Sequence, residues 1–276
     1  MGEIVTKKVI YTLNIKSQKS LNISKDHLDV VKLHCEMLPE YIPSKFTWME
    51  RMTEIFNPND LSNLVFSNGN VDNVWWKRIE KPKASGRWMR SGIRLGNPSS
   101  YTHSDIGLNV GDTLYQNKLV DYLKQASVQS VADIGFIDSV ADNYKQIAIQ
   151  SEYAPYGGDL LLSTKLLRNW LPEMPWAVVF GPAYIRMFGI EKALNVPAYK
   201  VEKIGEEMVF IQLTSRMEDI HEQYNLVMQA RAVAKKYLGE ECFFKSELAY
   251  NFNAQPDKAG KVFKVPMFEM LIDKTA

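Results

Sequence analysis

The chain has little that would hold it together covalently or anchor it in a membrane. Its 276 residues include two cysteines, Cys35 and Cys242, which are too few for a disulfide framework or a thiolate zinc site. No apolar run approaches the roughly 18 residues of a membrane span. Lys7 and Lys8 interrupt the apolar N-terminal stretch that a signal peptide would need. These absences predict a protein with no disulfide and no membrane segment, residing in the reducing cytoplasm.

Net charge is equally scarce. The chain carries 33 Lys and Arg against 32 Asp and Glu, which leaves a net charge of +1. No global field therefore draws it to nucleic acid or to an anionic membrane. Hydrophobic residues make up 46% and charged residues 24%, a composition typical of a folded globular protein with a core of ordinary size. Such a core needs no metal or cofactor for stability, and we expect none.

Motifs for catalysis are also missing. The sequence holds no G-x-S-x-G elbow, dinucleotide fingerprint or P-loop. Residues 174–189, MPWAVVFGPAYIRMFG, place Gly181-Pro182 after an apolar run, but Pro182 lacks the N–H that a phosphate would need and favours the first position of a helix. The best acid–base or metal fragment, His103-Ser104-Asp105, has no third ligand that can be named. We therefore expect a structural corner at Gly181-Pro182, no catalytic or metal site and no enzyme.

Strand and helix patterns alternate irregularly along the chain. Strands are expected in 4–15, in a hairpin around Asn68-Gly69, and in 87–95, 104–112, 130–138, 144–152 and 176–180. A second hairpin is expected in 198–214, with Gly205 near its turn. Helices are expected in 25–38, 45–56, 113–126, 163–170 and 215–238, and Gly239 marks the end of the last one. Because no regular βαβ alternation is present, these patterns predict an α+β fold of mainly antiparallel sheets flanked by helices.

The chain divides most naturally between Ala126 and Val131, although no flexible linker marks the place. This predicts an N-terminal α+β half with a β-rich middle, residues 1–126, and a C-terminal α+β half, residues 127–276. Two similar α+β subdomains packed together are an open alternative that no sequence repeat supports. The sequence indicates no oligomeric state.

One segment combines charge of one sign with aromatic residues. Residues 75–94, WWKRIEKPKASGRWMRSGIR, hold seven Lys and Arg against Glu80, a local balance of +6. Three interpretations stay open: a hairpin with one Trp face in the core and a solvated basic face, a protein-binding face, or a platform for single-stranded nucleic acid. The candidate partner-binding residues here are Trp75, Trp76, Arg78, Arg87, Trp88 and Arg90.

The second half resembles a known family. Three stretches carry the resemblance: LLRNWLPEMPWAVVFGPAYIRMFGIEKAL at 166–194, the text from Val196 to Thr214, and VFKVPMFEM at 262–270. A Trp-led apolar strand, a Gly-Pro, a short helix and a Gly are similar to the immunity protein fifty-two family and the related type VI immunity family of bacteria. The matching text covers roughly 157–270, and the first half matches by general layout alone. The shared motif is structural and supplies no catalytic residue.

The resemblance implies a binding function. Such immunity proteins bind a secreted or injected toxin in the cytoplasm of the producer and occlude it, often at a nuclease active site. The implied partner is therefore a cognate toxin protein, and the alternative is a nucleic-acid-binding or defence-accessory module that uses 75–94. An acidic patch would complement a basic nuclease, and Glu206 and Glu207 are the candidates for it. Further acidic residues in this half are Glu202, Glu218, Asp219, Glu222, Glu240 and Glu241. A solvated charged face is the other interpretation of these residues.

Overall fold

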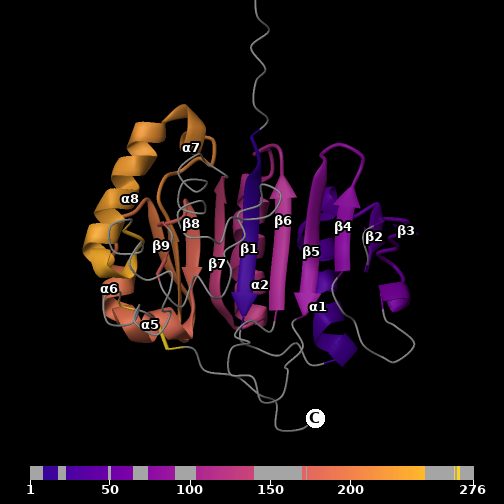
Figure 1. Cartoon of the computed structure of the whole chain (residues 1–276), viewed down its shortest axis with the longest axis horizontal. Coiled ribbons are helices and arrows are strands. Elements are labelled where there is room, and N and C mark those ends of the chain that lie inside the picture. Colours follow the sequence, from indigo (N-terminus) through magenta and orange to yellow (C-terminus); the bar gives the residue numbers. More distant parts are fainter. Residues whose placement is uncertain are drawn as a thin grey trace, which may run out of the picture.

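The strands of the protein form one antiparallel sheet with helices on both of its faces (Figure 1). The computed structural model describes residues 9–17, 23–48, 51–64, 74–90, 104–139, 170–171, 173–245, 264 and 266–267. Within these residues the sheet has ten strands in the order β3-β2-β4-β5-β6-β1-β7-β8-β10-β9. The expected α+β class with mainly antiparallel strands is confirmed.

The elements follow one another with short strands and mostly short helices. The strands are β1 (Tyr11–Ser17), β2 (Lys45–Thr47), β3 (Glu54–Ile55), β4 (Val74–Arg78), β5 (Ala84–Arg90), β6 (Ser104–Val110), β7 (Ala132–Ser139), β8 (Ala177–Phe180), β9 (Lys200–Gly205) and β10 (Met208–Gln212). The α-helices are α1 (Ile23–Met37), α2 (Gln116–Gln129), α5 (Pro182–Phe188), α6 (Ile190–Leu194), α7 (Asp219–Glu222) and α8 (Tyr224–Leu238). Among the described residues, no helix is both long enough and apolar enough to cross a lipid bilayer.

The first strand occupies the middle of the sheet. In β1, Tyr11 is opposite Val110 of β6 on one side and opposite Ser139 of β7 on the other. Strands from the 1–126 and 127–276 segments therefore share one hydrogen-bonded sheet. The division into two halves stays a prediction.

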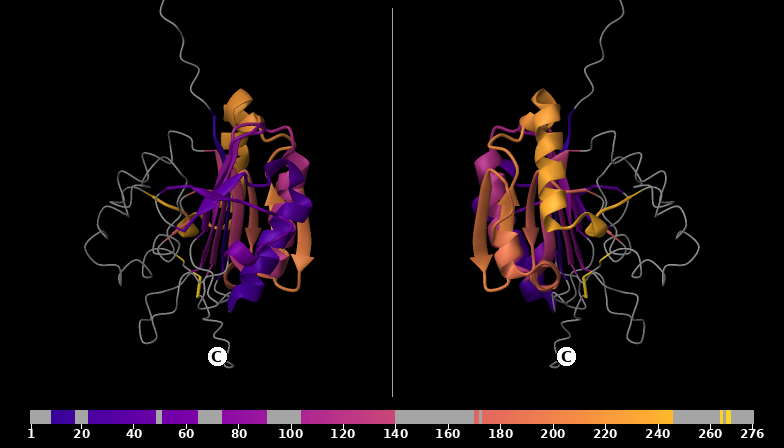
Figure 2. Two further views of the ribbon diagram at one scale, coloured as in Figure 1. Left: turned by 90° about the vertical axis from the view of Figure 1, so that its right-hand side faces the viewer. Right: turned by 90° about the vertical axis from the view of Figure 1, so that its left-hand side faces the viewer.

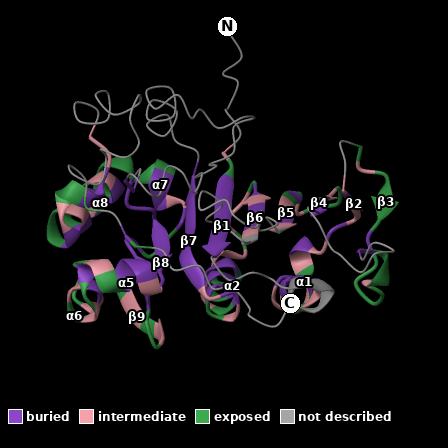
Figure 3. Ribbon diagram, turned by 60° about the horizontal axis from the view of Figure 1, so that its bottom comes forward, coloured by how far each residue is buried: buried purple, intermediate pink, exposed green. Residues whose placement is uncertain are grey.

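Alternation along the strands gives each face of the sheet its own core. On one face Leu13, Trp88 and Phe210 belong to a cluster that α1 and α2 cover (Figure 2). On the other face Phe136 and Val178 belong to a cluster that includes residues of α5, α6 and α8. Successive residues of a strand point to opposite faces, so β7 and β8, which are buried along their whole length (Figure 3), contribute to both clusters.

The corner at Gly181-Pro182 is confirmed. The buried strand β8 ends at Phe180, and Pro182 occupies the first turn of α5, where its missing N–H costs nothing. A Cβ on Gly181 would lie 1.7 Å from the carbonyl oxygen of Ala132. Gly181 has φ −90° and ψ −169°, so the glycine is required by the close approach of β7, since any residue adopts this backbone conformation.

The helix expected over 45–56 is wrong. These residues form β2 and β3, with Lys45 opposite Ile55 and Phe46 opposite Trp76 of β4. The ring of Phe46 lies 5.0 Å from that of Trp48, centroid to centroid. Pairing with β4 and burial of Phe46 override the local helical pattern, because tertiary context commonly outweighs intrinsic propensity.

The helix expected over 215–238 is present but interrupted. Gln223, with φ −126° and ψ 47°, separates α7 from α8, and neither helix has a side-chain N-cap bond. The expected end at Gly239 is confirmed by its φ of +118°, a conformation that glycine tolerates best. The β9–β10 hairpin is also confirmed. The expected elements around Asn68-Gly69 and over 144–152 and 163–169 lie outside the described residues.

Candidate protein-binding surface

The basic and aromatic segment forms the β4–β5 hairpin, and two of its tryptophans belong to the core. Trp76 and Trp88 are buried, with ring centroids 5.4 Å apart. The ring of His34 on α1 packs edge-on against both, at 5.0 and 5.4 Å. Burial raises the cost of charging His34 and lowers its pKa to about 4. Neither indole is presented to a partner, so the two tryptophans act in folding.

Trp75 points to the opposite face of the hairpin and is 38% exposed. The Cζ atom of Arg87 lies 5.8 Å from the centroid of its ring, within the range of a cation–π contact. Arg87 itself is buried. The side chain of Arg90 lies outside the described residues. Of the three tryptophans in this segment, only Trp75 is therefore accessible. Binding of single-stranded nucleic acid would need several exposed aromatic rings, on which successive bases could stack.

Arg87 takes part in a buried polar cluster on that face. Asp105 accepts a hydrogen bond from Asn14 at 2.7 Å, and its other oxygen lies 2.8 Å from Lys16 Nζ and 3.4 Å from Arg87 Nη2. Burial alone would raise the pKa of Asp105, but Lys16, Arg87 and the Asn14 hydrogen bond hold it below its usual value. The ionised Asp105 carboxylate on β6 therefore links three strands, because Asn14 and Lys16 lie on β1 and Arg87 lies on β5.

Arg78 is also engaged within the molecule. It donates a hydrogen bond to the carbonyl oxygen of Ile42 at 3.1 Å and lies 3.8 Å from the Glu80 carboxylate. His103 lies outside the described residues. Across the described ranges, no three His, Cys, Asp or Glu side chains come together in a way that would hold a metal ion.

The acidic candidates lie at the β9–β10 turn. Glu206 and Glu207 are both exposed, and Glu207 lies 3.4 Å from Arg186 Nη1. Glu202 is bound by Lys200 at 2.8 Å and Lys124 at 3.2 Å. Neighbouring cations thus offset much of the negative charge that the sequence places in this half. The turn and the β4–β5 hairpin belong to distant strands, so the structure does not join the two sets of candidates into one patch.

A different surface combines hollows and exposed apolar side chains, and sequence reasoning missed it. Three adjoining hollows surround the start of α2, with volumes of about 530, 390 and 350 Å³. We call their lining the α2 surface. The first is lined by Lys81, Pro82, Lys83, Gly111, Asp112 and Leu114; the second includes Leu114, Tyr115, Asn117, Lys118, Arg216 and Glu218; the third includes Asn117, Asp121, Lys124, Tyr199, Lys200 and Ser215. Leu114 joins the first two hollows, and Asn117 joins the second to the third.

Two large side chains stand out on the α2 surface. Leu114 is 77% exposed and Tyr199 is 62% exposed. Leu114 lies beside Lys81, Lys83 and Arg216, which line the first two hollows. Tyr199 lies beside Lys124 and Lys200, which line the third. Tyrosine and arginine beside an exposed apolar side chain are typical of the centres of protein interfaces.

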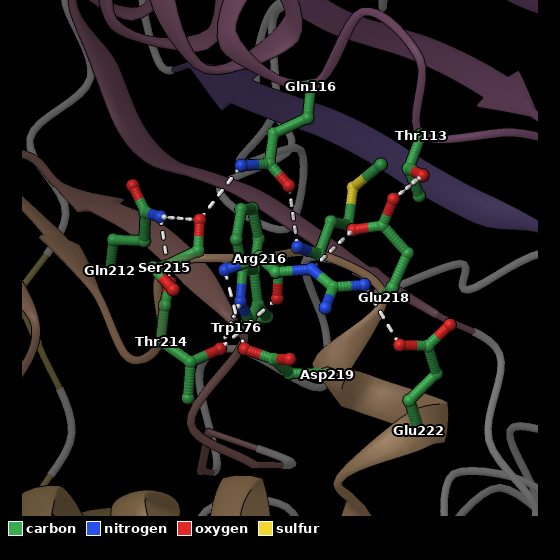
Figure 4. A network of polar contacts seen from close by, with 11 residues as sticks. Thr113, Gln116, Trp176, Gln212, Thr214, Ser215, Arg216, Glu218, Asp219 and Glu222 are labelled. Carbon is green, nitrogen blue, oxygen red and sulfur yellow. Dashed lines mark hydrogen bonds and ion pairs between the residues drawn. The ribbon is translucent and has the colours of Figure 1, made fainter.

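A network of hydrogen bonds holds the segments that form this surface in place (Figure 4). Gln116 donates a hydrogen bond to the carbonyl of Ser215 at 2.8 Å and accepts one from the Met217 N–H at 2.6 Å. The indole of Trp176 donates to Thr214 Oγ1 at 2.9 Å. The two Gln116 bonds join the start of α2 to the segment after β10, which is about a hundred residues away in sequence. The Trp176 bond joins that segment to the residue before β8. A surface fixed in this way loses little conformational freedom on binding.

Glu218 belongs to the same network and contacts Thr113 and Arg216. Its carboxylate accepts a hydrogen bond from Thr113 and lies 3.7 Å from Arg216 Nε. Burial would raise the pKa of Glu218, but the Thr113 hydrogen bond and the Arg216 charge hold it below the usual value. The carboxylate therefore stays ionised at neutral pH and holds Arg216 at the rim of the second hollow.

No sequence signal would have found this surface. Leu114 is a single apolar residue in a turn, and Ser215 to Glu218 have the spacing of a helix start. The surface exists because the β4–β5 turn, the β6–α2 turn and the segment after β10 meet at one end of the sheet.

No family model matches the chain, and no curated protein matches it. Among solved structures, the fold is similar to a Pseudomonas aeruginosa protein described as T6SS protein PA0821. The two chains are 10% identical, with a TM-score of 0.48 over 94% of this chain and 87% of that one.

Proposed function

We propose that the protein is a non-enzymatic immunity-like protein that binds a cognate toxin and occludes it, and that the α2 surface makes the contact. The observation that carries the proposal is Leu114, which is 77% exposed on a turn that a polar network holds in place. Burying a leucine side chain contributes roughly 1.5–3 kcal/mol. A side chain left in water on a fixed turn is therefore available to a partner at little ordering cost.

The resemblance of 157–270 to bacterial immunity proteins supplies the class of partner. Occlusion needs a complementary surface and no catalytic groups. This agrees with the structural role of the buried ion pairs Arg87–Asp105 and Arg231–Asp138. The alternative, a nucleic-acid-binding module built on 75–94, is weakened because Trp76, Trp88 and Arg87 are buried.

The test is co-expression with the product of the gene immediately upstream. We expect that product to stop growth when expressed alone, the wild-type chain to restore growth, and the two proteins to co-elute. Leu114→Glu should abolish protection, because it would place a charge in the buried centre of the interface.

Ile55→Glu is the matched control. Ile55 is 75% exposed, like Leu114, but lies on β3 at the far edge of the sheet. We expect it to protect as well as wild type. An upstream product that is harmless, or that the chain does not neutralise, would overturn the immunity proposal. Equal protection by Leu114→Glu and Ile55→Glu would overturn the placement of the interface.

A further inference from the structure

Unpaired positive charge on the α2 surface is concentrated in the first of its three hollows. Lys81 and Lys83 line this hollow on either side of Pro82, and both lysines are exposed. Neither has an ion-pair partner among the described residues. The two ammonium groups are therefore available to a partner that carries negative charge.

The carboxylates nearest to these lysines are already engaged within the molecule. Asp112 lines the same hollow, and its Oδ1 accepts hydrogen bonds from the Leu114 N–H at 3.2 Å and from the Tyr41 hydroxyl at 3.3 Å. Glu80, in the β4–β5 turn, accepts a hydrogen bond from the Ser44 hydroxyl. With two lysines against one carboxylate, the lining of the first hollow has a formal charge of +1.

The second and third hollows differ, because each of their cations has a carboxylate partner. The pairs are Lys118–Glu40, Lys124–Glu202, Lys200–Glu202 and Arg216–Glu222. Opposite charges in contact cancel much of each other's field at a distance. The positive potential of the α2 surface is therefore expected to be strongest at its Lys81–Lys83 end.

Leu114 places an apolar contact beside this positive charge. Its side chain is 77% exposed and lines the first hollow together with both lysines. An aromatic ring suits such a place, because it packs against leucine and against the aliphatic stems of lysines, and its face attracts their ammonium groups.

We propose that the toxin segment that docks in the first hollow is acidic and carries an aromatic side chain. Its carboxylates pair with Lys81 and Lys83, and its ring packs on Leu114. This inference rests on the proposed binding of a toxin at the α2 surface and adds the chemistry of the segment that is bound. It reverses, at this surface, the charge expected from the sequence, in which acidic residues of this chain meet a basic nuclease.

Two synthetic peptides test the proposal without the toxin. One has four glutamates around a phenylalanine, and the other has four lysines around a phenylalanine. Each is titrated into the full-length ¹⁵N-labelled protein at low ionic strength, and the amide chemical shifts of Lys81, Lys83 and Leu114 are followed. We expect the acidic peptide to shift these amides with a dissociation constant of about 0.1–1 mM, and the basic peptide to leave them unchanged. Binding of neither peptide, or equal binding of both, would overturn the proposal.

Charge reversal in the hollow tests the role of the lysines. Lys83→Glu should weaken binding of the acidic peptide about two- to tenfold, as expected for reversal of one exposed charge. Lys236→Glu is the matched control, because Lys236 is exposed on α8, outside the α2 surface, and has no ion-pair partner in the described part of the chain. Both variants change the net charge equally, so equal weakening by the two would overturn the proposal.

A second comparison tests the apolar contact. Leu114→Ala should weaken binding of the acidic peptide, but it should leave binding unchanged when glycine replaces the phenylalanine of that peptide. An equal loss for both peptides would overturn the contact between the ring and Leu114.

The peptide titrations and the growth assay fail separately. Protection against the upstream gene product without selectivity for the acidic peptide would overturn the acidic segment and leave the immunity proposal standing. Selectivity for the acidic peptide without protection would overturn the immunity proposal and leave the first hollow as a site for acidic segments.

Discussion

Replacing Gly181 by alanine tests the corner that joins β8 to α5. The added Cβ would lie 1.7 Å from the Ala132 carbonyl oxygen, whereas an ordinary contact begins at 3.4 Å. The two strands would have to separate locally by the difference, 1.7 Å. The obstacle is backbone of the central strand β7, which cannot rotate aside as a side chain could. The Gly181 N–H also donates to the Asp133 carbonyl at 2.8 Å, and that bond would be lost.

Overpacking of this kind costs about 1–3 kcal/mol, and the lost hydrogen bond about 1 kcal/mol more. We expect Gly181→Ala to lower the free energy of unfolding by about 2–4 kcal/mol and the melting temperature by roughly 4–16 °C. Chemical and thermal denaturation followed by circular dichroism measure both quantities. Gly205→Ala is the control, because its Cβ would meet Met208 at an ordinary 3.4 Å. A melting temperature of Gly181→Ala within 2 °C of the control would refute the steric argument.

Three further predictions concern buried charge and binding. Asp138→Ala, which removes the bidentate partner of the buried Arg231, should cost about 3–5 kcal/mol in urea unfolding, whereas a loss under 1 kcal/mol would contradict a structural ion pair. Burial lowers the pKa of His34 to about 4 in the folded protein, from about 6.5 for an exposed imidazole, so the unfolded chain binds more protons between these values. Stability should therefore fall by about 3 kcal/mol as pH drops from 6.5 to 4. His34→Gln should flatten that slope, and an unchanged slope would contradict the assignment. Single-stranded oligonucleotide should bind no tighter than about 10⁻⁵ M near physiological salt; submicromolar binding that Trp75→Ala weakens would favour the nucleic-acid alternative.

Local patterns in the sequence determined much of the fold. The apolar run before Gly181-Pro182 predicts a buried strand followed by a corner, and Gly239 predicts the end of a helix, because each depends on a few neighbouring residues. The hairpin around Gly205 and the helix after Thr113 follow from the same short-range rules. The α+β class then follows from the order of the elements.

Contacts between distant segments decided the rest. The pattern at 45–56 is compatible with a helix, and only pairing of Phe46 with Trp76 makes it a strand. The sequence places Trp75 and Trp88 in one basic segment, but the pleat directs one to the surface and the other to the core. Arg87 is likewise a surface cation in the sequence and a buried partner of Asp105 in the structure.

The candidate surface depends on tertiary structure most of all. Three separate turns supply Lys83, Leu114 and Tyr199. The residues next to each of them in the sequence form no motif that indicates a binding site. They line adjoining hollows because β1 inserts between β6 and β7 and so brings the ends of early and late strands to one end of the sheet. Helix α8 is intermediate. Its two apolar rows are visible in the sequence, whereas burial of the side that carries Arg231, which pairs with Asp138, shows which row faces water.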